Sequence, residues 1–229
     1  MLIFAAEFSQ KRKMKYKTAI FDLDGTLLDT IGDLSEAVNH ALALRGLPLH
    51  SVSEYRLMVG HGVRNLVTRA LPEEMQGDEA LIDSALKDFK EYYTAHIDVF
   101  TRPYPGMREL LETLKDAGVH LAVASNKFQS GTEHLVREFF PSCSFVSILG
   151  NREGFPLKPD PAIVEEILRC SGDSPAEAVM VGDSGSDMKT AANGGIAAIA
   201  VTWGYRALPE SDAYSLATTP AALLGLLTR

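Results

Sequence analysis

The chain has 229 residues, 46% of them hydrophobic and 23% charged, a length and composition typical of a globular protein with a full core. Its formal net charge of -8 excludes a general nucleic-acid binder, and no apolar run reaches the ~18 residues that span a membrane. Only two cysteines are present, Cys143 and Cys170, in no zinc-binding or disulfide pattern, so we expect a protein of the reducing cytoplasm.

The first residues differ from the rest of the sequence. A short apolar run at residues 2–6 is followed by polar and basic residues, and it is too short for a signal peptide. A more regular pattern begins at Met14. We therefore interpret residues 1–14 as an N-terminal extension and assign them no function.

The most informative segment follows. Residues 19–21 are apolar and predict a short buried strand, which runs directly into Asp22, Asp24 and Gly25. Gly25 allows the chain to turn at once, and the carboxyl ends of strands are where open α/β sheets bind ligands. Two carboxylates so close repel each other unless a cation relieves them, so Mg²⁺ is the expected partner. An ordinary strand and turn remains the alternative for this segment alone.

The rest of the sequence alternates between strand-like and helical patterns, with one interruption. Strand-length apolar runs occupy residues 119–124, 145–149, 178–181 and 196–201. The helical patterns between them predict an α/β fold in which helices join parallel strands. Residues 31–102 are instead typical of several helices separated by glycine and proline. We interpret 31–102 as an inserted helical cap domain, with 15–30 and 103–229 as the α/β core domain.

Polar residues with chemical potential follow three of the later segments. Ser125 and Asn126 follow the second strand, Lys158 is flanked by a proline, and Asp183 and Asp187 follow the fourth strand. Singly, these residues are compatible with a helix cap, a surface lysine and a helix N-terminus. Together they favour a phosphate site, because acids that converge from two strands bind a metal and a lysine beside them neutralises phosphate.

In this order, the segments resemble the haloacid dehalogenase-like superfamily of aspartate-nucleophile phosphatases. The run Asp22-Leu23-Asp24-Gly25-Thr26 is similar to its first motif, Ser125 to the second, Lys158 to the third, and Gly182-Asp183 with Asp187 to the fourth. The resemblance extends from about Lys15 to Leu227. It implies a Rossmann-like three-layer core with a parallel sheet of order 3-2-1-4-5 and a helical type-one cap.

Within the superfamily, two further segments look like phosphoglycolate phosphatases. They are residues 59–67, in the cap, and residues 102–106, which follow it. This likeness implies a phosphomonoesterase that uses Mg²⁺ and acts on a small anionic phosphoester, with 2-phosphoglycolate as the first choice. His61 and Arg64 of the cap are the residues expected to contact the part of the substrate beyond the phosphate.

The resemblance also implies a role for each matching residue. Asp22 would attack phosphorus to form an aspartyl-phosphate, and Asp24 would act as the general acid and base. Mg²⁺ would be held by the Asp22 and Asp183 carboxylates and the Asp24 backbone carbonyl, with Asp187 supporting the metal site or Lys158. The residues expected to bind the phosphoryl oxygens are Gly25, Thr26, Ser125, Asn126 and Lys158.

Several alternatives stay open at this point. A phosphosugar mutase of the β-phosphoglucomutase type, a pyrophosphatase and a nucleotidase share much of the pattern. A non-catalytic binding module is disfavoured because every expected acid and the lysine are present. The spacer Ser184-Gly185-Ser186 is small and flexible, so the reach of Asp187 is open, and both a monomer and a homodimer are compatible with the sequence.

Overall fold

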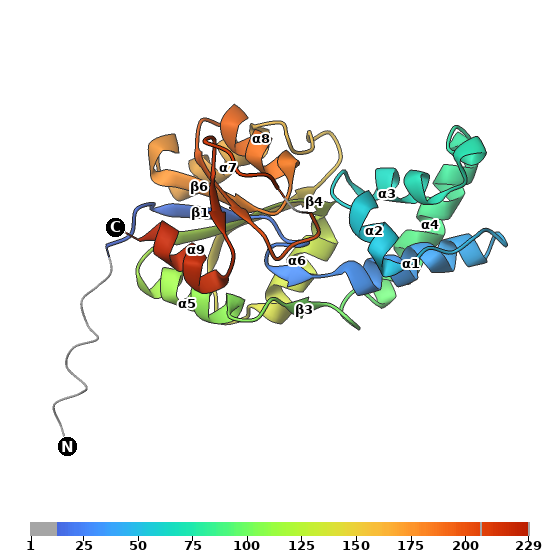
Figure 1. Ribbon diagram of the computed structural model, residues 1–229, viewed down its shortest axis with the longest axis horizontal. Coiled ribbons are helices and arrows are strands. Elements are labelled where there is room, and N and C mark those ends of the chain that lie inside the picture. The colour runs from blue at the N-terminus through green and yellow to red at the C-terminus, as the bar shows by residue number, and fades with distance from the viewer. Residues whose placement is uncertain (1–12, 207, 229) are drawn as a thin grey trace, which may run out of the picture.

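The computed structural model describes residues 13–206 and 208–228. An α/β unit and a group of helices lie beside each other along the long axis of the molecule (Figure 1). Of the extension predicted for residues 1–14, only the last two residues fall within the described range, and Met14 forms an antiparallel bridge with Thr228. The start of the described chain is thus attached to its end.

A parallel sheet forms the centre of the α/β unit. Within the described residues its strands are β1 (Thr18–Phe21), β4 (His120–Phe128), β5 (Phe145–Asn151), β6 (Ala178–Gly182), β7 (Ala197–Val201) and β8 (Ser215–Ala217). Their order is β5-β4-β1-β6-β7-β8, and all neighbours are parallel. The predicted order 3-2-1-4-5 is confirmed for the first five, and β8 is an additional edge strand that the sequence analysis missed.

The two faces of the sheet carry separate halves of the core. In β1, Ala19 and Phe21 belong to one hydrophobic cluster and Ile20 belongs to the other, as the period of two in a strand requires. The first cluster is covered by α5 (Met107–Asp116), α6 (Gln129–Phe139) and α9 (Pro220–Leu227), the second by α7 (Ala162–Ser171) and α8 (Gly185–Asn193). The core therefore has the three layers expected (Figure 1).

The strand register brings the chemistry-bearing segments together. Phe21, the last residue of β1, is level with Val123 of β4 on one side and with Val181 of β6 on the other. The chain order of the strands reverses at β1, which is where α/β sheets place their ligands. The residues that follow these three strands consequently emerge next to one another at one edge of the sheet.

The helical part lies beside that edge. It comprises α1 (Ile31–Ala43), α2 (Val52–Met58), α3 (Val63–Ala70), the short 3₁₀ helix η1 (Glu73–Met75) and α4 (Glu79–Ala95). Another 3₁₀ helix, η2 (Pro175–Glu177), precedes β6 in the α/β unit. The four helices α1 to α4 and the 3₁₀ helix η1 all lie within the segment 31–102, and we infer that this segment acts as a cap.

Two chain segments connect the helical part to the α/β unit, one entering it and one leaving it. Two short strands and one buried carboxylate hold these segments together. β2 (Leu28–Asp29) pairs antiparallel with β3 (Arg102–Pro103). Asp33, at 2% exposure, accepts hydrogen bonds from the backbone N–H groups of Phe100 and Thr101 and from the Thr101 hydroxyl. The entry and return segments are therefore hydrogen-bonded to each other.

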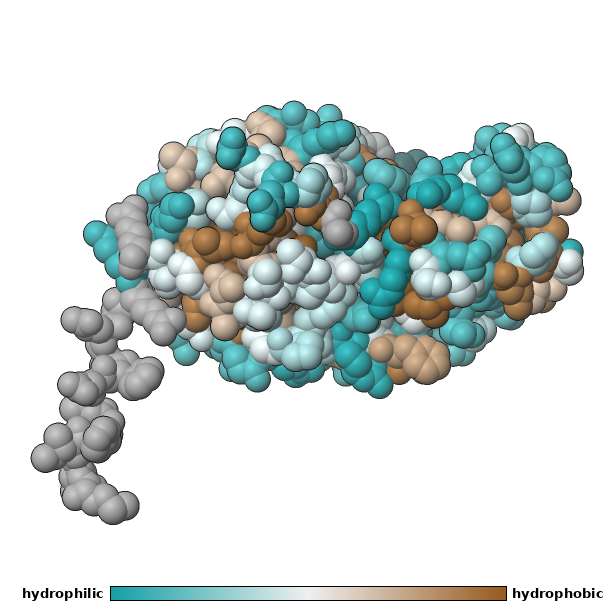
Figure 2. Space-filling view, viewed as in Figure 1, coloured by the Kyte–Doolittle hydropathy of each residue, from teal (hydrophilic) through white to brown (hydrophobic). Residues whose placement is uncertain are grey.

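The surface of the helical part carries most of the exposed apolar side chains. Figure 2 shows hydrophobic residues scattered over a largely hydrophilic face. The large exposed ones within 31–102 are Leu44, Leu49, Val52, Leu57, Val99 and Phe100. None of the helices in the described part of the chain is long and apolar enough to span a membrane.

Candidate active site

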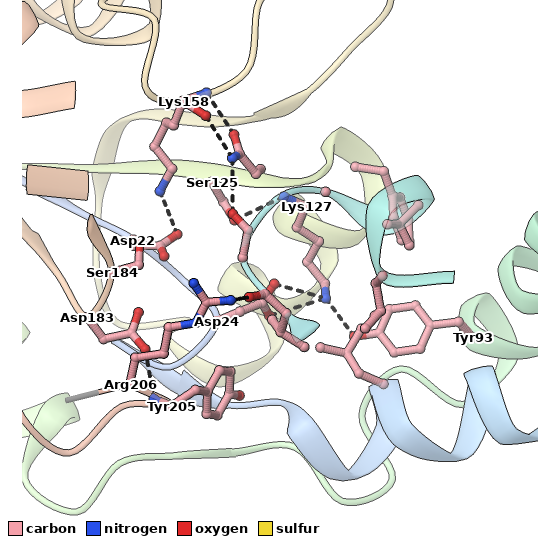
Figure 3. A pocket seen from close by; sticks show the side chains of 18 of the residues that line it. Asp22, Asp24, Tyr93, Ser125, Lys127, Lys158, Asp183, Ser184, Tyr205 and Arg206 are labelled. Carbon is pink, nitrogen blue, oxygen red and sulfur yellow. Dashed lines mark hydrogen bonds and ion pairs between the residues drawn. The ribbon is translucent and has the colours of Figure 1, made fainter. Parts of the chain in front are cut away.

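A pocket lies between the edge of the sheet and the helical part. The α/β unit lines it with polar side chains, among them Asp22, Asp24 and Lys158, whereas the helical part contributes mainly apolar ones such as Leu66 and Phe89 (Figure 3). The pocket is therefore charged on one wall and apolar on the other. Such a combination suits a ligand whose reacting group is ionic and lies against the polar wall.

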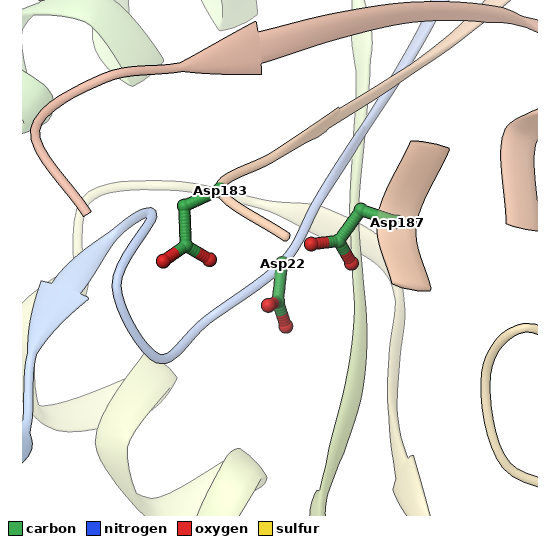
Figure 4. Close-up of side chains that lie close together, drawn as sticks. All are labelled: Asp22, Asp183 and Asp187. Atoms are coloured by element: carbon green, nitrogen blue, oxygen red, sulfur yellow. The ribbon is translucent and has the colours of Figure 1, made fainter. Parts of the chain in front are cut away.

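Three buried carboxylates converge at the sheet edge. Asp22, Asp183 and Asp187 each offer an oxygen, and these atoms all lie within 4.8 Å of one another (Figure 4). The backbone places them, because the N–H of Asp22 donates to the Val181 carbonyl at 2.9 Å across the sheet. The backbone N–H of Tyr205 in turn donates to Asp183 Oδ2 at 2.8 Å and fixes that carboxylate.

Lys158 is the cation that this cluster holds. Its Nζ lies 2.9 Å from Asp22 Oδ1 and 2.6 Å from Asp187 Oδ1, and it donates to the Ala124 carbonyl at 2.8 Å. Burial alone lowers the pKa of Lys158, but the Asp187 and Asp22 carboxylates outweigh it, and the pKa is raised. Lys158 is therefore a permanently charged group in contact with Asp22.

The backbone of Lys158 is held by Asn126. The Asn126 side chain accepts a hydrogen bond from the Lys158 N–H at 2.9 Å and donates to the Lys158 carbonyl at 3.2 Å. Asn126 lines the pocket, but this pair of bonds explains its position without a phosphate contact. Its predicted phosphate contact stays a prediction.

Asp187 supports Lys158 in the structure. Its Oδ2 accepts from the Ser184 N–H at 3.0 Å and from the Ser184 hydroxyl at 2.6 Å, a capping box at the start of α8. Since Oδ1 is bonded to Lys158, both oxygens already have donors. A Cβ added at Gly182 would lie 2.3 Å from Asp187 Cγ, so the preceding turn leaves room for this carboxylate only because it contains glycine.

The carboxylate cluster carries more negative charge than Lys158 neutralises. Burial and the Asp187 charge raise the pKa of Asp22 well above its ordinary value. The same two causes raise the pKa of Asp183 from 3.8 to about 7. Hard carboxylate oxygens with unbalanced charge are the ligands that Mg²⁺ prefers. The donor set thus fits the expected ion, which Asp22 and Asp183 would hold with the Asp24 carbonyl.

Two glycines shape the space around Asp183. Gly25 has a φ of +86°, in the left-handed region, and a Cβ there would lie 2.4 Å from Asp183 Oδ2. A Cβ added at Gly204 would lie 2.3 Å from the same oxygen. Gly25 was predicted to contact phosphate, but it is not among the residues that line the pocket in the described chain. Its observed contribution is the close approach to Asp183.

Asp24 lies in a separate network that reaches the helical part. Its Oδ1 accepts from the Thr30 hydroxyl at 2.6 Å and lies 3.2 Å from Lys127 Nζ. Lys127 also donates to the Tyr93 hydroxyl of α4 at 2.6 Å. The sequence analysis missed Lys127 and Tyr93, although Lys127 directly follows the Ser125-Asn126 pair.

The two hydroxyls predicted to bind phosphate, those of Ser125 and Thr26, differ in their position relative to the pocket. Ser125 lines the pocket, and its Oγ accepts the Lys127 N–H at 3.2 Å. Thr26 Oγ1 is buried with no hydrogen-bond partner among the described residues, and Thr26 is not among the residues that line the pocket there. A buried hydroxyl without a partner is unusual and is compatible with a ligand contact.

The structure does not bring the two predicted cap residues into the pocket. Arg64 is exposed on α3, where it donates to Asp83 at 2.6 Å and also pairs with Glu79, so its predicted contact with the substrate stays a prediction. His61 is not among the lining residues of the described chain, although its neighbours Gly60 and Gly62 are. The cap residues that do line the pocket are mainly apolar.

The chain is similar in sequence to known proteins. A family model for haloacid dehalogenase-like hydrolases matches residues 19–201. The phosphoglycolate phosphatase of Mesorhizobium japonicum is 38% identical over 187 residues, which make up 81% of this chain and 82% of that protein. The phosphoglycolate phosphatase of Agrobacterium fabrum is 36% identical over 193 residues, with 83% and 82% covered.

Solved structures share the architecture as well. A suggested phosphoglycolate phosphatase from Lactobacillus delbrueckii subsp. bulgaricus matches with a TM-score of 0.87 and 34% identity, covering 94% of this chain and 99% of that one. CbbY from Rhodobacter sphaeroides, solved in complex with phosphate, matches with a TM-score of 0.74 and 25% identity, covering 91% and 96%. The chain belongs to the haloacid dehalogenase-like hydrolase family.

Proposed function

We propose that this phosphatase hydrolyses a small phosphomonoester, 2-phosphoglycolate, through an aspartyl-phosphate on Asp22. The observation that carries the proposal is the contact of Asp22 with Lys158 at 2.9 Å, in a pocket that Asp24, Ser125 and Asp183 also line. A nucleophile beside a buried cation and a pair of acids is the set that phosphoryl transfer requires.

The groups of the pocket divide the chemistry between them. A carboxylate oxygen of Asp22 attacks phosphorus as the ester P–O bond breaks, and Asp24 gives a proton to the departing alkoxide. Asp24 then takes a proton from the water that attacks the phosphoenzyme, which releases inorganic phosphate and restores Asp22. Lys158 and Ser125 bind phosphoryl oxygens during both steps.

Magnesium, when bound, would contribute positive charge that offsets the cluster and the phosphoryl group. The residues that would hold it are Asp22 and Asp183, with the backbone carbonyl of Asp24. The support for this assignment is the convergence of the Asp22 and Asp183 carboxylates, whose pKa values burial and the Asp187 charge raise even with Lys158 beside them.

The lining of the pocket favours a small substrate. The helical part faces the carboxylates and Lys158 mainly with apolar side chains such as Val63, Leu66 and Phe89. These side chains offer few hydrogen-bond partners to the hydroxyls of a hexose phosphate or a nucleotide, and each unpaired hydroxyl would weaken binding. The relatives named phosphoglycolate phosphatase support 2-phosphoglycolate as this substrate.

Phosphate release from a panel of esters tests the proposal. With Mg²⁺, we expect kcat/KM for 2-phosphoglycolate to exceed that for glucose 1-phosphate, a nucleoside monophosphate and pyrophosphate at least about 10-fold, and a chelator to abolish all activity. Conversion of glucose 1-phosphate to the 6-phosphate without phosphate release would instead establish a mutase. Equal rates on all esters would contradict the substrate assignment.

A second prediction concerns stability in the absence of metal. The folded pKa of Asp183 is raised to about 7 from 3.8, so the folded state binds more protons than the unfolded state between these values. The free energy of unfolding therefore falls as pH rises from about 4 to 7 and then levels off, by a few kcal/mol.

Mg²⁺ should reverse this loss, because it binds the deprotonated carboxylates. Thermal unfolding at pH 5 and pH 8, with and without Mg²⁺, measures the effect. We expect the Mg²⁺-dependent rise in Tm to be larger at pH 8, and the same comparison in Asp183→Asn to show little rise at either pH. A Mg²⁺ effect that is equal at both pH values would contradict the charge argument.

A further inference from the structure

Three cationic side chains of the described residues line the pocket, and they differ in their partners. Lys158 is paired with Asp22 and Asp187, and Lys127 with Asp24. Arg206 pairs with no carboxylate within the described chain; its Nη2 donates to the backbone carbonyls of Leu57 at 3.1 Å and Val59 at 2.6 Å. The remaining donors of its guanidinium make no hydrogen bond to the described residues.

The backbone fixes Arg206 relative to the carboxylate cluster. Arg206 follows Tyr205, whose N–H donates to Asp183 Oδ2 and whose hydroxyl accepts the Thr30 N–H at 2.7 Å. Its guanidinium, in contrast, reaches the carbonyls at the end of α2. Arg206 therefore spans the α/β unit and the helical part at the pocket (Figure 3).

The surroundings favour an anion beside Arg206. Burial lowers the pKa of His61, and the charges of Arg206, Arg69 and Lys189 lower it further, so this part of the structure is electropositive. The facing wall of the pocket is apolar, with Val63, Leu66 and Phe89. An anionic group that enters there meets Arg206 as the available charge partner, and a guanidinium binds a carboxylate through two parallel hydrogen bonds.

We infer that Arg206 binds the carboxylate of the substrate and thereby selects phosphoesters that carry a second anionic group. The inference rests on the proposed function and extends it, since it assigns the recognition of the non-phosphate end to the α/β unit rather than to His61 and Arg64. Lys158 and Ser125 bind the phosphoryl end, and Arg206 binds the other.

Selectivity between two matched esters tests this inference. The ratio of kcat/KM for 2-phosphoglycolate to that for 2-hydroxyethyl phosphate, which replaces the carboxylate by a neutral hydroxymethyl group, is measured with Mg²⁺ for the wild type, Arg206→Gln and Arg206→Lys. We expect the ratio to fall about 10- to 100-fold in Arg206→Gln and less in Arg206→Lys, through an increase in KM for 2-phosphoglycolate.

Arg69→Gln is the matched control. Arg69 also donates to the Leu57 carbonyl, at 2.9 Å, but does not line the pocket in the described chain. Both variants lose a hydrogen bond to the Leu57 carbonyl of α2. Only Arg206→Gln also loses the guanidinium proposed to bind the substrate carboxylate. Arg69 contributes only a more distant positive charge, so the selectivity ratio of Arg69→Gln should stay within about 2-fold of the wild-type ratio.

Binding provides a readout that does not depend on turnover. Calorimetry with 3-phosphonopropionate, an unreactive isostere of 2-phosphoglycolate, and with propylphosphonate, its counterpart without the carboxylate, should show the same loss of selectivity in Arg206→Gln. A wild type that selects the carboxylate while Arg206→Gln keeps the full ratio would overturn the inference alone. A wild type with no preference for 2-phosphoglycolate would overturn both the proposed substrate and the inference.

Discussion

Replacing Asp22 with Asn is expected to reduce the turnover of 2-phosphoglycolate by at least about 10⁴-fold while the fold remains intact. An amide has the shape of the carboxylate but is a poor nucleophile, so no phosphoenzyme forms. Because burial and the Asp187 charge raise the pKa of Asp22, the neutral amide also relieves repulsion in the cluster. The Tm of the metal-free variant should therefore equal or exceed that of the wild type.

Asp24→Asn is the informative comparison, because its expected defect depends on the leaving group. Acetyl phosphate is as small as 2-phosphoglycolate, and its acetate leaves without a proton. Asp24→Asn should thus form the phosphoenzyme from acetyl phosphate faster than from 2-phosphoglycolate, and rapid acid quenching with mass spectrometry detects it. Asp22→Asn should form none from either substrate. Substantial turnover by purified Asp22→Asn would disprove the nucleophile assignment.

The convergence of the acids and Lys158 could be predicted because it depends on short-range rules. Apolar runs of strand length locate the ends of β1, β4 and β6, and parallel strands bring their carboxyl ends to one edge. The register that places Phe21 level with Val123 and Val181 follows from this arrangement. Residues such as Asp22 and Asp183 therefore meet wherever the sheet forms.

The partners of individual side chains could not be predicted in the same way. Lys127 contacts Tyr93 of α4 across 34 residues, and Arg206 contacts Val59 across 147. Such contacts depend on how the helical part sits on the sheet, which no local pattern describes. The partners of Arg64 were likewise not predicted: it lies in the segment that resembles phosphoglycolate phosphatases, and in the structure it pairs with Glu79 and Asp83 on the surface.

The short edge strand escaped prediction for another reason. β8 has three residues, Ser215–Ala217, which is too short for alternation or an apolar run to be recognised. It forms only because β7 offers an unpaired edge, with Val201 level with Ala217. Tertiary pairing, rather than the propensity of the segment, makes it a strand.

Replacing Lys158 with Met is expected to destabilise the protein by about 3–5 kcal/mol and to reduce kcat at least about 100-fold. The side chain is 2% exposed, and its removal leaves Asp22 and Asp187 buried without their cation. The loss of stability should be larger at pH 8 than at pH 6, because burial raises the pKa of Asp22 and its carboxylate is more fully ionised at the higher pH. Denaturant unfolding at pH 6 and pH 8, without metal, measures it.

Two further variants distinguish the contribution of Lys158 to stability from its contribution to catalysis. Lys189→Met removes an exposed lysine from α8, and it should change neither the free energy of unfolding nor kcat appreciably. Lys158→Met combined with Asp187→Asn removes one buried charge of each sign, so most of the stability should return. Activity should not, because the phosphoryl group still lacks its ammonium partner beside Asp22. If the double variant regained activity along with stability, Lys158 would serve the fold alone, and the proposed binding of phosphoryl oxygens by Lys158 would be wrong.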